Sequence, residues 1–417
     1  MKAMERFIHL KKDSITLLLL LLFVVSVPLK NNLNSISIIL LGVYSLIVFL
    51  KAKQFQKALF TKLLPLIFFF LVSLLSVFYS EDKGYAIDLV VRLLPFLIFP
   101  FVFSILSVSK KQLVVVLKSF ILWMTLVCLY SHSMVLYKLF ENNDILFNLF
   151  NNHYSYMSLA NDTIGLHTTY YAYYVLIAIV FLVYFLFQEK RTLYRSLYFL
   201  LLFYLSFFIF HLSTRTPIAV LFLFFNFSIL YYFFKQKKTG KGIALLLLLY
   251  IVTSITVYNV RTTRYRFQQL FGFTYYNGLH QDDGENKLIQ WEAAIHANKN
   301  IVFGNGIGDA DASIFKSYID FSKKTFAERE YNAHNQFIQT YVSLGLVGVV
   351  LLLLIFLFYC RAFYKQSFFI GYTIMVLTFF LFQTESYLVR HNGIVMFVFL
   401  ICIFINYSSL NNKELNT

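Results

Sequence analysis

Apolar runs of about 17 to 25 residues recur along this chain of 417 residues, and they constrain its fold more than any other feature. A run of that length is what an α-helix needs to cross the hydrocarbon core of a bilayer, where backbone polar groups must be satisfied within the segment. Twelve such runs are present, at roughly 14–29, 33–50, 63–79, 93–108, 113–137, 167–188, 196–213, 216–234, 242–258, 336–359, 367–383 and 393–407. The sequence therefore predicts an all-α polytopic membrane protein with about 12 transmembrane helices and one large, partly helical loop outside the membrane.

The composition supports this class and argues against several others. Hydrophobic residues make up 59% of the chain and charged residues only 13%, a balance that a water-soluble globule could not bury. The formal net charge of +16 is attributed to lysines and arginines that flank membrane spans, so nucleic acid is not an expected partner, whereas membrane lipids are. Cys128, Cys360 and Cys402 lie in apolar runs without metal-ligand spacing, and neither a metal nor a cofactor is predicted.

The distribution of lysine and arginine predicts the orientation of the chain. If both termini are cytoplasmic, the inside segments hold 21 of the 36 basic residues, the short outside loops hold 6, and a long loop holds the remaining 9. Long loops are largely exempt from the positive-inside bias, so 21 against 6 is the relevant comparison. The predicted organisation is transmembrane helices 1–9 in residues 1–258, a periplasmic loop domain in 259–335, and transmembrane helices 10–12 with a short cytoplasmic tail in 336–417.

Two of the predicted outward segments are longer than turns. Residues 138–166 are rich in Asn and Asp, and a solvated loop is favoured over binding of sugar hydroxyls. The loop 259–335 contains a helix-like piece from Glu285 to Asn298, with Leu288, Trp291 and Ile295 at helical spacing. The glycine-rich stretch Gly304-Asn305-Gly306-Ile307-Gly308 follows it. We interpret this stretch as a tight turn, because no buried strand precedes it as a phosphate-binding loop would require.

Arginines at the outer ends of the spans are candidate anion ligands. Arg215 is followed by Thr216 and Pro217, which are predicted to cap and to open the next helix. This arginine either binds a phosphate beside helix amino termini or extends its guanidinium to the interfacial water. Arg261, Arg264 and Arg266 follow the ninth span and either supply a second clamp or anchor the chain to anionic headgroups.

His334 is the candidate catalytic residue, at or just before the start of an outward-facing helix. The positive end of a helix disfavours the imidazolium, so a histidine there is expected to be neutral and able to accept a proton. Helix capping by His334 is the alternative. Asn335 adjoins it, Glu385 and Arg390 belong to the last outward turn, where they are either substrate ligands or a surface pair, and His167 opens the sixth span from the same side.

These segments resemble the O-antigen ligase and Wzy-type polymerase superfamily of bacterial inner membranes. The resemblance rests first on Ala333-His334-Asn335-Gln336-Phe337-Ile338-Gln339, which continues through Leu344-Gly345-Leu346-Val347-Gly348. Further similar segments are Trp291 with Ala293-Ala294, Phe303-Gly304-Asn305-Gly306-Ile307-Gly308-Asp309, His167-Thr168-Thr169-Tyr170 and Glu385-Ser386-Tyr387-Leu388. One departure is Lys287, four residues before Trp291, where many relatives are expected to carry arginine, and a lysine cannot clamp a phosphate bidentately.

The resemblance implies a metal-independent, inverting glycosyltransferase without a cofactor, which takes a glycan from undecaprenyl pyrophosphate at the outer face of the inner membrane. The acceptor is the lipid A-core in a ligase, the preferred reading, or another lipid-linked glycan in a polymerase. His334 would be the base and Arg215 and Arg264 the pyrophosphate clamp, with Arg261, Arg266, Asn335, His167, Glu385 and Arg390 as further substrate ligands. The alternative is a flippase for lipid-linked oligosaccharides, which would place charges near the bilayer midplane and often shows repeated halves.

Overall fold

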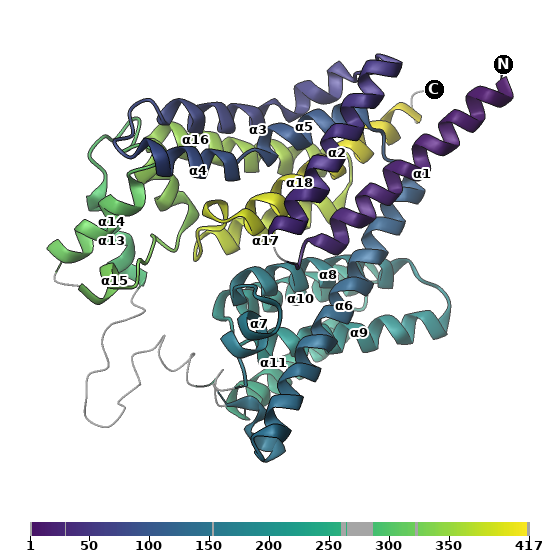
Figure 1. Ribbon diagram of the computed structural model, residues 1–417. Helices are drawn as coiled ribbons and strands as arrows, with labels where there is room; N and C mark the ends of the chain where they lie inside the picture. The colour runs from purple at the N-terminus through teal and green to yellow at the C-terminus, as the bar shows by residue number, and fades with distance from the viewer. Residues whose placement is uncertain are drawn as a thin grey trace. The chain divides into compact units, whose positions relative to one another are not determined.

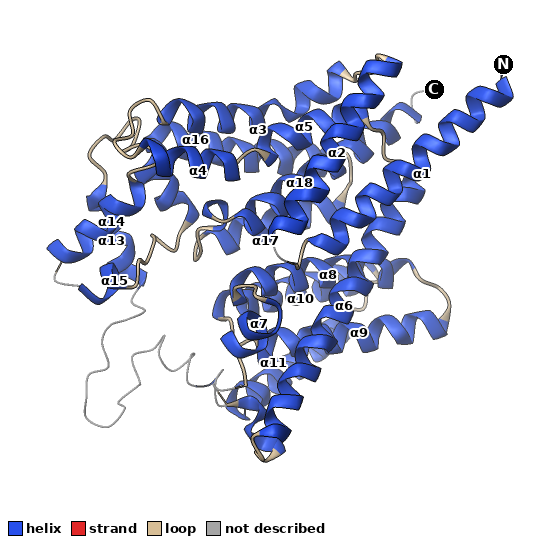
Figure 2. Ribbon diagram, viewed as in Figure 1, coloured by secondary structure: helices blue, strands red, loops and turns tan. Residues whose placement is uncertain are grey.

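The computed structural model describes residues 2–29, 31–151, 154–259, 264, 287–321 and 324–414, and the regular secondary structure in these ranges is helical (Figures 1 and 2). Ten helical segments of the described ranges are long and apolar enough to cross a membrane, if Lys83–Ile105, which consists of two consecutive helices, is counted as one segment. Two shorter apolar helices, Asp13–Ser26 and Phe369–Phe382, coincide with two further predicted runs. The predicted class of an all-helical polytopic protein is confirmed by these helices.

The chain forms two compact units. Unit 1 comprises Met1–Val27, Asn31–Val116 and Asp282–Thr417, and unit 2 comprises Pro28–Lys30 and Leu117–Gln281. Unit 1 contains α1 (Lys2–Ser26), α2 (Asn31–Ala52), α3 (Lys57–Ser76), α4 (Lys83–Arg92), α5 (Pro95–Ile105), the start of α6 (Lys110–Glu141), α13 (Lys287–Ala297), α14 (Ala310–Asp320), α15 (Lys324–Glu328), α16 (Gln336–Lys365), α17 (Phe369–Phe382), η2 (Tyr387–Val389) and α18 (His391–Glu414). Unit 2 contains the rest of α6, then η1 (Leu146–Phe150), α7 (Met157–Ile164), α8 (Thr168–Gln188), α9 (Thr192–His211), α10 (Arg215–Lys235) and α11 (Thr239–Asn259).

Within unit 1, α18 packs against α3 and α5, and its contact with α5 includes aromatic side chains and one buried amide. Asn406 of α18 is fully buried, and its Nδ2 donates to the carbonyls of Phe103 at 2.6 Å and Leu106 at 2.8 Å. Its Oδ1 accepts from the backbone N–H of Val108 at 2.9 Å. The amide thus satisfies the backbone groups that the end of α5 leaves open in an apolar environment.

The helices α13, α14 and α15 form a small cluster beside the beginning of α16 (Figure 1). The predicted helix within 285–298 is confirmed over Lys287–Ala297, but its buried face is not the apolar stripe. Leu288 and Ile295 are exposed, whereas Ala293 and Ala294 are buried and bring α13 close to α14. The Ser317 hydroxyl of α14 donates to the carbonyl of Ala293 at 2.7 Å, an approach that only a small residue on α13 permits.

The helix α16 is interrupted at Gly345, whose φ of 63° and ψ of −159° are not helical. The sequence predicted a continuous helix here, and the structure places the loop 301–306 in the gap. Leu346 N–H donates to the Ile301 carbonyl at 2.8 Å and Val347 N–H to the Val302 carbonyl at 3.2 Å. Asn305 N–H donates to the Val342 carbonyl at 2.8 Å and Gly306 N–H to the Ser343 carbonyl at 3.1 Å, so the loop replaces the missing helical hydrogen bonds.

Glycine is required on both sides of this junction. Gly304 has a φ of +73°, and a Cβ there would lie 2.6 Å from the backbone nitrogens of Leu344 and Gly345. A Cβ on Gly345 would lie 2.3 Å from the carbonyl of Val302. The prediction of a tight turn at 304–308 is confirmed, and the reason for its glycines is close packing of two backbones.

The segment 138–166 of unit 2 is folded by its own polar side chains. The Tyr154 hydroxyl donates to Asp144 and accepts from Asn142 Nδ2 at 3.0 Å, while Asn148 Nδ2 donates to Asp144 Oδ1 at 3.2 Å. The hydrogen bond to Asp144 raises the pKa of the Tyr154 phenol, so the hydroxyl stays a donor. The asparagines and aspartate that suggested a solvated loop therefore serve in part to hold η1 to the end of α6.

Candidate functional site

His334 lies directly before the amino-terminal cap of α16, as the sequence predicted. Asn335 occupies the cap position, and its Oδ1 accepts from the N–H groups of Phe337 at 2.9 Å and Ile338 at 3.2 Å. His334 itself has a φ of 44°, and its N–H donates to Asn332 Oδ1 at 2.9 Å. The capping alternative for His334 is therefore wrong, because Asn335 makes the capping bonds and the imidazole points elsewhere.

The imidazole of His334 faces the carboxylate of Glu385. Its Nδ1 lies 3.3 Å from each of the two carboxylate oxygens. The side chains are 25% and 12% exposed, so the pair is largely but not completely shielded from solvent. Because a carboxylate accepts and does not donate, the Nδ1 that faces Glu385 carries a proton, and in that tautomer of the imidazole Nε2 is the acceptor. No residue in the described part of the chain hydrogen-bonds Nε2.

A hydrogen-bond network fixes the backbone that carries His334. The N–H of Ala333 donates to Gln339 Oε1 at 3.1 Å, and Gln339 Nε2 donates to Asp311 Oδ1 at 2.8 Å. Asp311 Oδ2 accepts from the Tyr85 hydroxyl at 2.8 Å. The Tyr318 hydroxyl donates to the Asn332 carbonyl at 3.2 Å, and burial followed by the nearby Asp311 raises the pKa of this phenol. The imidazole is thus positioned by side chains of α4, α14 and α16.

The turn that carries Glu385 is tied to the same helix start. Asn335 Nδ2 donates to the Gln383 carbonyl at 3.0 Å, and Leu388 N–H donates to Gln336 Oε1 at 2.6 Å. Lys287 Nζ donates to the Thr384 carbonyl at 2.6 Å, which places a positive charge one residue from Glu385. From the sequence, Lys287 was only a departure from the family pattern. Its contact with the Thr384 carbonyl was not predictable, because the two residues are 97 positions apart along the chain.

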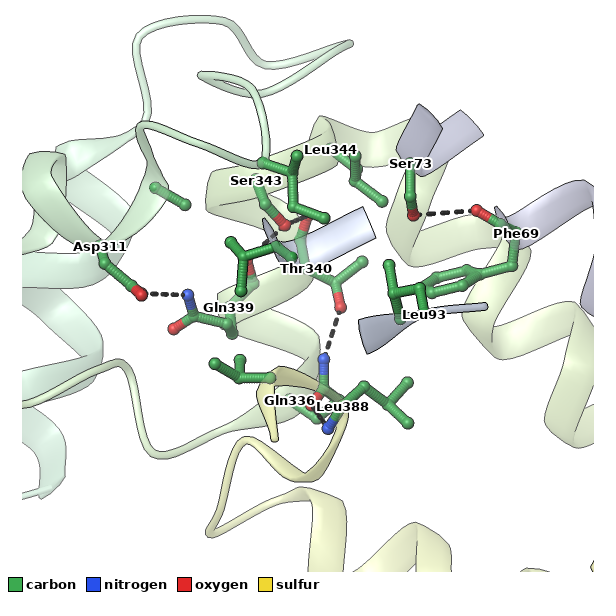
Figure 3. Close-up of a pocket in the computed structure, with 14 residues that line it drawn as sticks. Phe69, Ser73, Leu93, Asp311, Gln336, Gln339, Thr340, Ser343, Leu344 and Leu388 are labelled. Atoms are coloured by element: carbon green, nitrogen blue, oxygen red, sulfur yellow. Dashed lines mark hydrogen bonds between the residues drawn. The ribbon is translucent and has the colours of Figure 1, made fainter. Parts of the chain in front are cut away.

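A small cavity lies behind this network, between polar side chains of α16 and apolar side chains of α3 and α4. Figure 3 shows Gln339 reaching Asp311 and Gln336 reaching Thr340, with Phe69 and Leu93 opposite. Its volume is about 40 Å³, room for a few water molecules and not for a sugar. The cavity therefore belongs to the support of the site, and the substrate has to approach His334 from another side.

Three predicted ligands lie in unit 2, described apart from the site in unit 1. Arg215 is half-buried and is the first residue of α10, with Thr214 at the cap position. The prediction that Thr216 caps this helix is wrong, because the cap position is Thr214, two residues earlier, and Thr216 and Pro217 lie in the first turn, where proline's missing N–H costs no helical hydrogen bond. His167 caps α8 through Nδ1, which accepts from Thr169 N–H at 3.4 Å. The Arg264 guanidinium stands over the Tyr258 ring at 5.3 Å.

The other predicted ligands are placed as follows. Arg390 of unit 1 is exposed, at the end of η2 and before α18. Among the described residues it forms no ion pair, and Glu385 pairs with His334 instead, so the predicted surface pair of Glu385 and Arg390 is absent there. Arg261 and Arg266 lie outside the described residues. No group of three or more His, Cys, Asp or Glu side chains suited to a metal ion occurs in the described ranges.

Unit 2 contains a buried histidine pair that the sequence did not single out. His211 Nε2 lies 2.9 Å from the Leu149 carbonyl and must donate to it, so its Nδ1 accepts from His132 Nε2 at 3.0 Å. His132 Nδ1, 3.1 Å from the Tyr204 hydroxyl, then accepts from that hydroxyl. This directed chain joins α6 and α9 to η1, and no local sequence signal marks it because its members lie 62 to 79 residues apart.

Comparison with known families now bears on this geometry. The model of the O-antigen ligase family matches residues 200–353, a segment that contains His334, Asn335, Arg215 and Arg264. Over this segment, the chain is similar to the O-antigen ligase family. Proteins of this family are glycosyltransferase-like enzymes that act on lipid-linked glycans, which agrees with a histidine and carboxylate pair in a polytopic membrane protein. A comparison with curated proteins found no match.

The matched segment covers the cap of α16 and the glycine turn, but it ends within α16. Glu385, Arg390 and His167 lie outside the matched segment. The pairing of His334 with Glu385 is thus a finding of the tertiary structure, since the two residues are 51 positions apart and only one of them belongs to the matched domain.

Proposed function

We propose that this protein transfers a glycan from undecaprenyl pyrophosphate to an acceptor hydroxyl, as an O-antigen ligase with the lipid A-core as acceptor in preference to a Wzy-type polymerase. The observation that carries the proposal is the His334–Glu385 pair at the start of α16, inside an O-antigen ligase domain and supported by a buried network. Within the described ranges, ten helical segments are long and apolar enough to cross a membrane, which suits a donor whose lipid stays in the bilayer.

The proposed chemical step uses His334 as a general base. Nε2 takes the proton of the acceptor hydroxyl while the hydroxyl oxygen attacks the anomeric carbon from the face opposite the pyrophosphate. The bond from that carbon to the pyrophosphate oxygen breaks, the pyrophosphate leaves with the electron pair, and the configuration inverts. Glu385 accepts the Nδ1 proton in a hydrogen bond throughout, so it holds the ring and stabilises the imidazolium that forms.

The leaving group requires positive charge. Charge grows on the pyrophosphate as the glycosidic bond breaks, so cations placed against it stabilise the transition state more than the bound substrate. Arg215 and Arg264 are proposed for this clamp, with Arg261 and Arg266 as further members. Lys287 supplies a point charge beside Glu385, where it would attract a phosphate oxygen without the bidentate geometry of arginine. No metal is part of this proposal.

The proposed placement in the cell follows the charge distribution. Both termini are cytoplasmic, residues 259–335 form a periplasmic loop domain between two membrane regions, 1–258 and 336–417, and the protein lies in the bacterial inner membrane. The 21 basic residues of the inside segments, against 6 in the short outside loops, support this orientation. His334 and Glu385 then lie at the periplasmic surface, where a flipped lipid-linked donor presents its glycan.

The proposal is tested by glycan profiling of a deletion strain complemented with the wild type, His334→Ala, Glu385→Gln or His296→Ala. His296 is an exposed histidine of α13 and serves as the matched control. Lipid-linked intermediates and surface polysaccharide are measured together. His334→Ala is expected to lower transfer about a hundredfold or more, because a positioned base contributes that much, and Glu385→Gln is expected to lower it less.

The products separate the two acceptors. Long chains that accumulate on undecaprenyl pyrophosphate in the deletion strain identify a ligase, whereas single repeat units that reach the lipid A-core without chains identify a polymerase. Full transfer by His334→Ala, at wild-type protein levels in the membrane, would refute the assignment of the base. An unchanged profile in the deletion strain itself would refute glycan transfer as the function.

A further inference from the structure

A second, larger cavity of about 650 Å³ lies in unit 1 on another side of α14. Its walls come from the residues after α3, from the loop 299–305 and from α14: Tyr79, Glu81, Lys299, Asn300, Phe303, Gly304, Asn305, Asp309, Ala312, Ser313 and Lys316. Asp311 does not line this cavity and binds Gln339 of the His334 network instead. Helix α14 therefore contributes to both sites, and the volume falls in the range of about 300–1,000 Å³ typical of ligand sites.

The walls of this cavity are rigid. Asp309 Oδ2 accepts from Glu81 N–H at 2.7 Å and its Oδ1 from Asp82 N–H at 2.9 Å, which joins the start of α14 to the segment after α3. The Tyr79 hydroxyl donates to the Phe303 carbonyl at 2.8 Å. Asn305 accepts from Lys299 N–H at 2.7 Å and donates to the Ala297 carbonyl at 2.8 Å. Such a preformed cavity binds a ligand at a small entropic cost.

The charged side chains of the cavity are balanced and accessible. Two lysines, Lys299 and Lys316, stand against two carboxylates, Glu81 and Asp309. Asp309 is committed to backbone N–H groups, whereas the side chains of Lys299, Lys316 and Glu81 form no ion pair with any residue of the described ranges. A balanced set of donors and acceptors does not select an anion such as a phosphate, and it suits a ligand with many hydroxyl groups.

Aromatic rings complete the lining. Tyr79 is 44% and Phe303 is 53% exposed, and hydrogen bonds hold both residues: the Tyr79 hydroxyl donates to the Phe303 carbonyl, and Phe303 N–H donates to Asn300 Oδ1 at 3.1 Å. An exposed ring next to hydroxyl-binding side chains offers an apolar surface to the C–H face of a pyranose, while its neighbours bind the hydroxyl groups. The cavity therefore offers aromatic rings to the C–H face of a sugar, and hydrogen-bond donors and acceptors to its hydroxyl groups.

We propose that this cavity is a saccharide-binding subsite, which holds sugars of the glycan substrate away from the reacting carbon. The proposal rests on the proposed glycan transfer for its biological meaning, but binding itself needs no reaction. The subsite holds part of the glycan on one side of α14 while His334, tied to the same helix through Gln339 and Asp311, acts on another part. It would favour glycans long enough to fill the cavity.

The test compares two tryptophan substitutions on α14 in the full-length, detergent-solubilised protein. Ala312→Trp fills the cavity from an exposed helix position that lines it, and Ile319→Trp adds the same bulk at an exposed position of α14 that does not. The probes are oligosaccharides of one and of two repeat units, released by mild acid from the surface polysaccharide of the producing strain, and binding is measured by calorimetry. Ala312→Trp is expected to raise the Kd at least about tenfold, while Ile319→Trp stays within about twofold of the wild type.

Equal affinity of the wild type and Ala312→Trp for both oligosaccharides would overturn the subsite, as would an equal loss in both tryptophan variants. His334→Ala is measured in parallel and is expected to bind the oligosaccharides like the wild type. Binding retained in His334→Ala and lost in Ala312→Trp supports the subsite even if the glycan profile refutes transfer. Transfer that depends on His334 with no saccharide bound at this cavity refutes the subsite alone.

Discussion

Gly345→Ala tests the junction between α16 and the loop 301–306. The backbone at Gly345 has a φ of 63° and a ψ of −159°, a region that only glycine occupies readily. An alanine Cβ would lie 2.3 Å from the carbonyl carbon and oxygen of Val302 and 2.5 Å from the nitrogen of Gly304. These neighbours are backbone atoms, so a rotamer change cannot relieve the overlap and the loop itself has to move away from α16.

The expected loss of stability follows from these two effects. A non-glycine residue at such angles costs about 1–3 kcal/mol. Movement of the loop weakens the four backbone hydrogen bonds that replace the helical bonds of α16, each of which contributes about 1 kcal/mol. If half of them are lost, the free energy of unfolding falls by roughly 3–5 kcal/mol. Transfer activity is expected to fall as well, because His334 directly precedes the cap of α16, about three turns before the break in that helix.

The assay is thermal unfolding of the purified protein in detergent, with Gly42→Ala as the control. Gly42 lies within α2, and a Cβ there would be 3.6 Å from Ile98 Cγ2, an ordinary contact, so alanine is expected to leave the apparent Tm unchanged or raise it slightly. Gly345→Ala is expected to lower the apparent Tm by roughly 5 °C or more. A Tm equal to that of Gly42→Ala would show that the loop does not depend on this backbone contact.

Three further substitutions test the supports of the two units. Asn335→Ala removes the cap of α16 and should lower the free energy of unfolding by about 1 kcal/mol. The rate of transfer should fall by more than this loss of stability accounts for, because the cap positions His334. Wild-type kinetics in this variant would contradict that role of the cap. His132→Phe leaves the buried Nδ1 of His211 and the Tyr204 hydroxyl without their hydrogen-bond partner. The free energy of unfolding, measured with a denaturant, should fall by about 1–3 kcal/mol. An unchanged denaturation midpoint would argue against the directed chain of hydrogen bonds. Asp309→Asn replaces one accepting oxygen by an NH2 group, which is itself a donor and cannot accept from the N–H of Glu81 or Asp82. The free energy of unfolding should fall by roughly 2 kcal/mol, and the thermal midpoint should fall with it. A wild-type midpoint would mean that these contacts are not needed to hold α14.

Much of the fold was predictable because the bilayer leaves a chain few choices. A run of apolar residues long enough to span it has to be a helix, so all twelve predicted runs coincide with helices, ten of them of full spanning length. The position of His334 before a helix was predictable for a local reason, since Asn335 is a strong capping residue ahead of an apolar run. The helix within 285–298 was visible from its spacing, although its buried face was not, because small residues that allow close packing give no apolar periodicity.

The sequence by itself therefore determined the membrane class, the helices and the histidine motif, all of which depend on neighbours in the chain. Only the tertiary structure decided what those elements do together: that Glu385 faces His334 from 51 residues away, that Lys287 lies beside Glu385, and that the glycine turn fills the break in α16. The physical reason is that hydrophobicity and helix propensity are local quantities, whereas an ion pair or an inserted loop depends on which distant backbones pack closely enough to exchange hydrogen bonds.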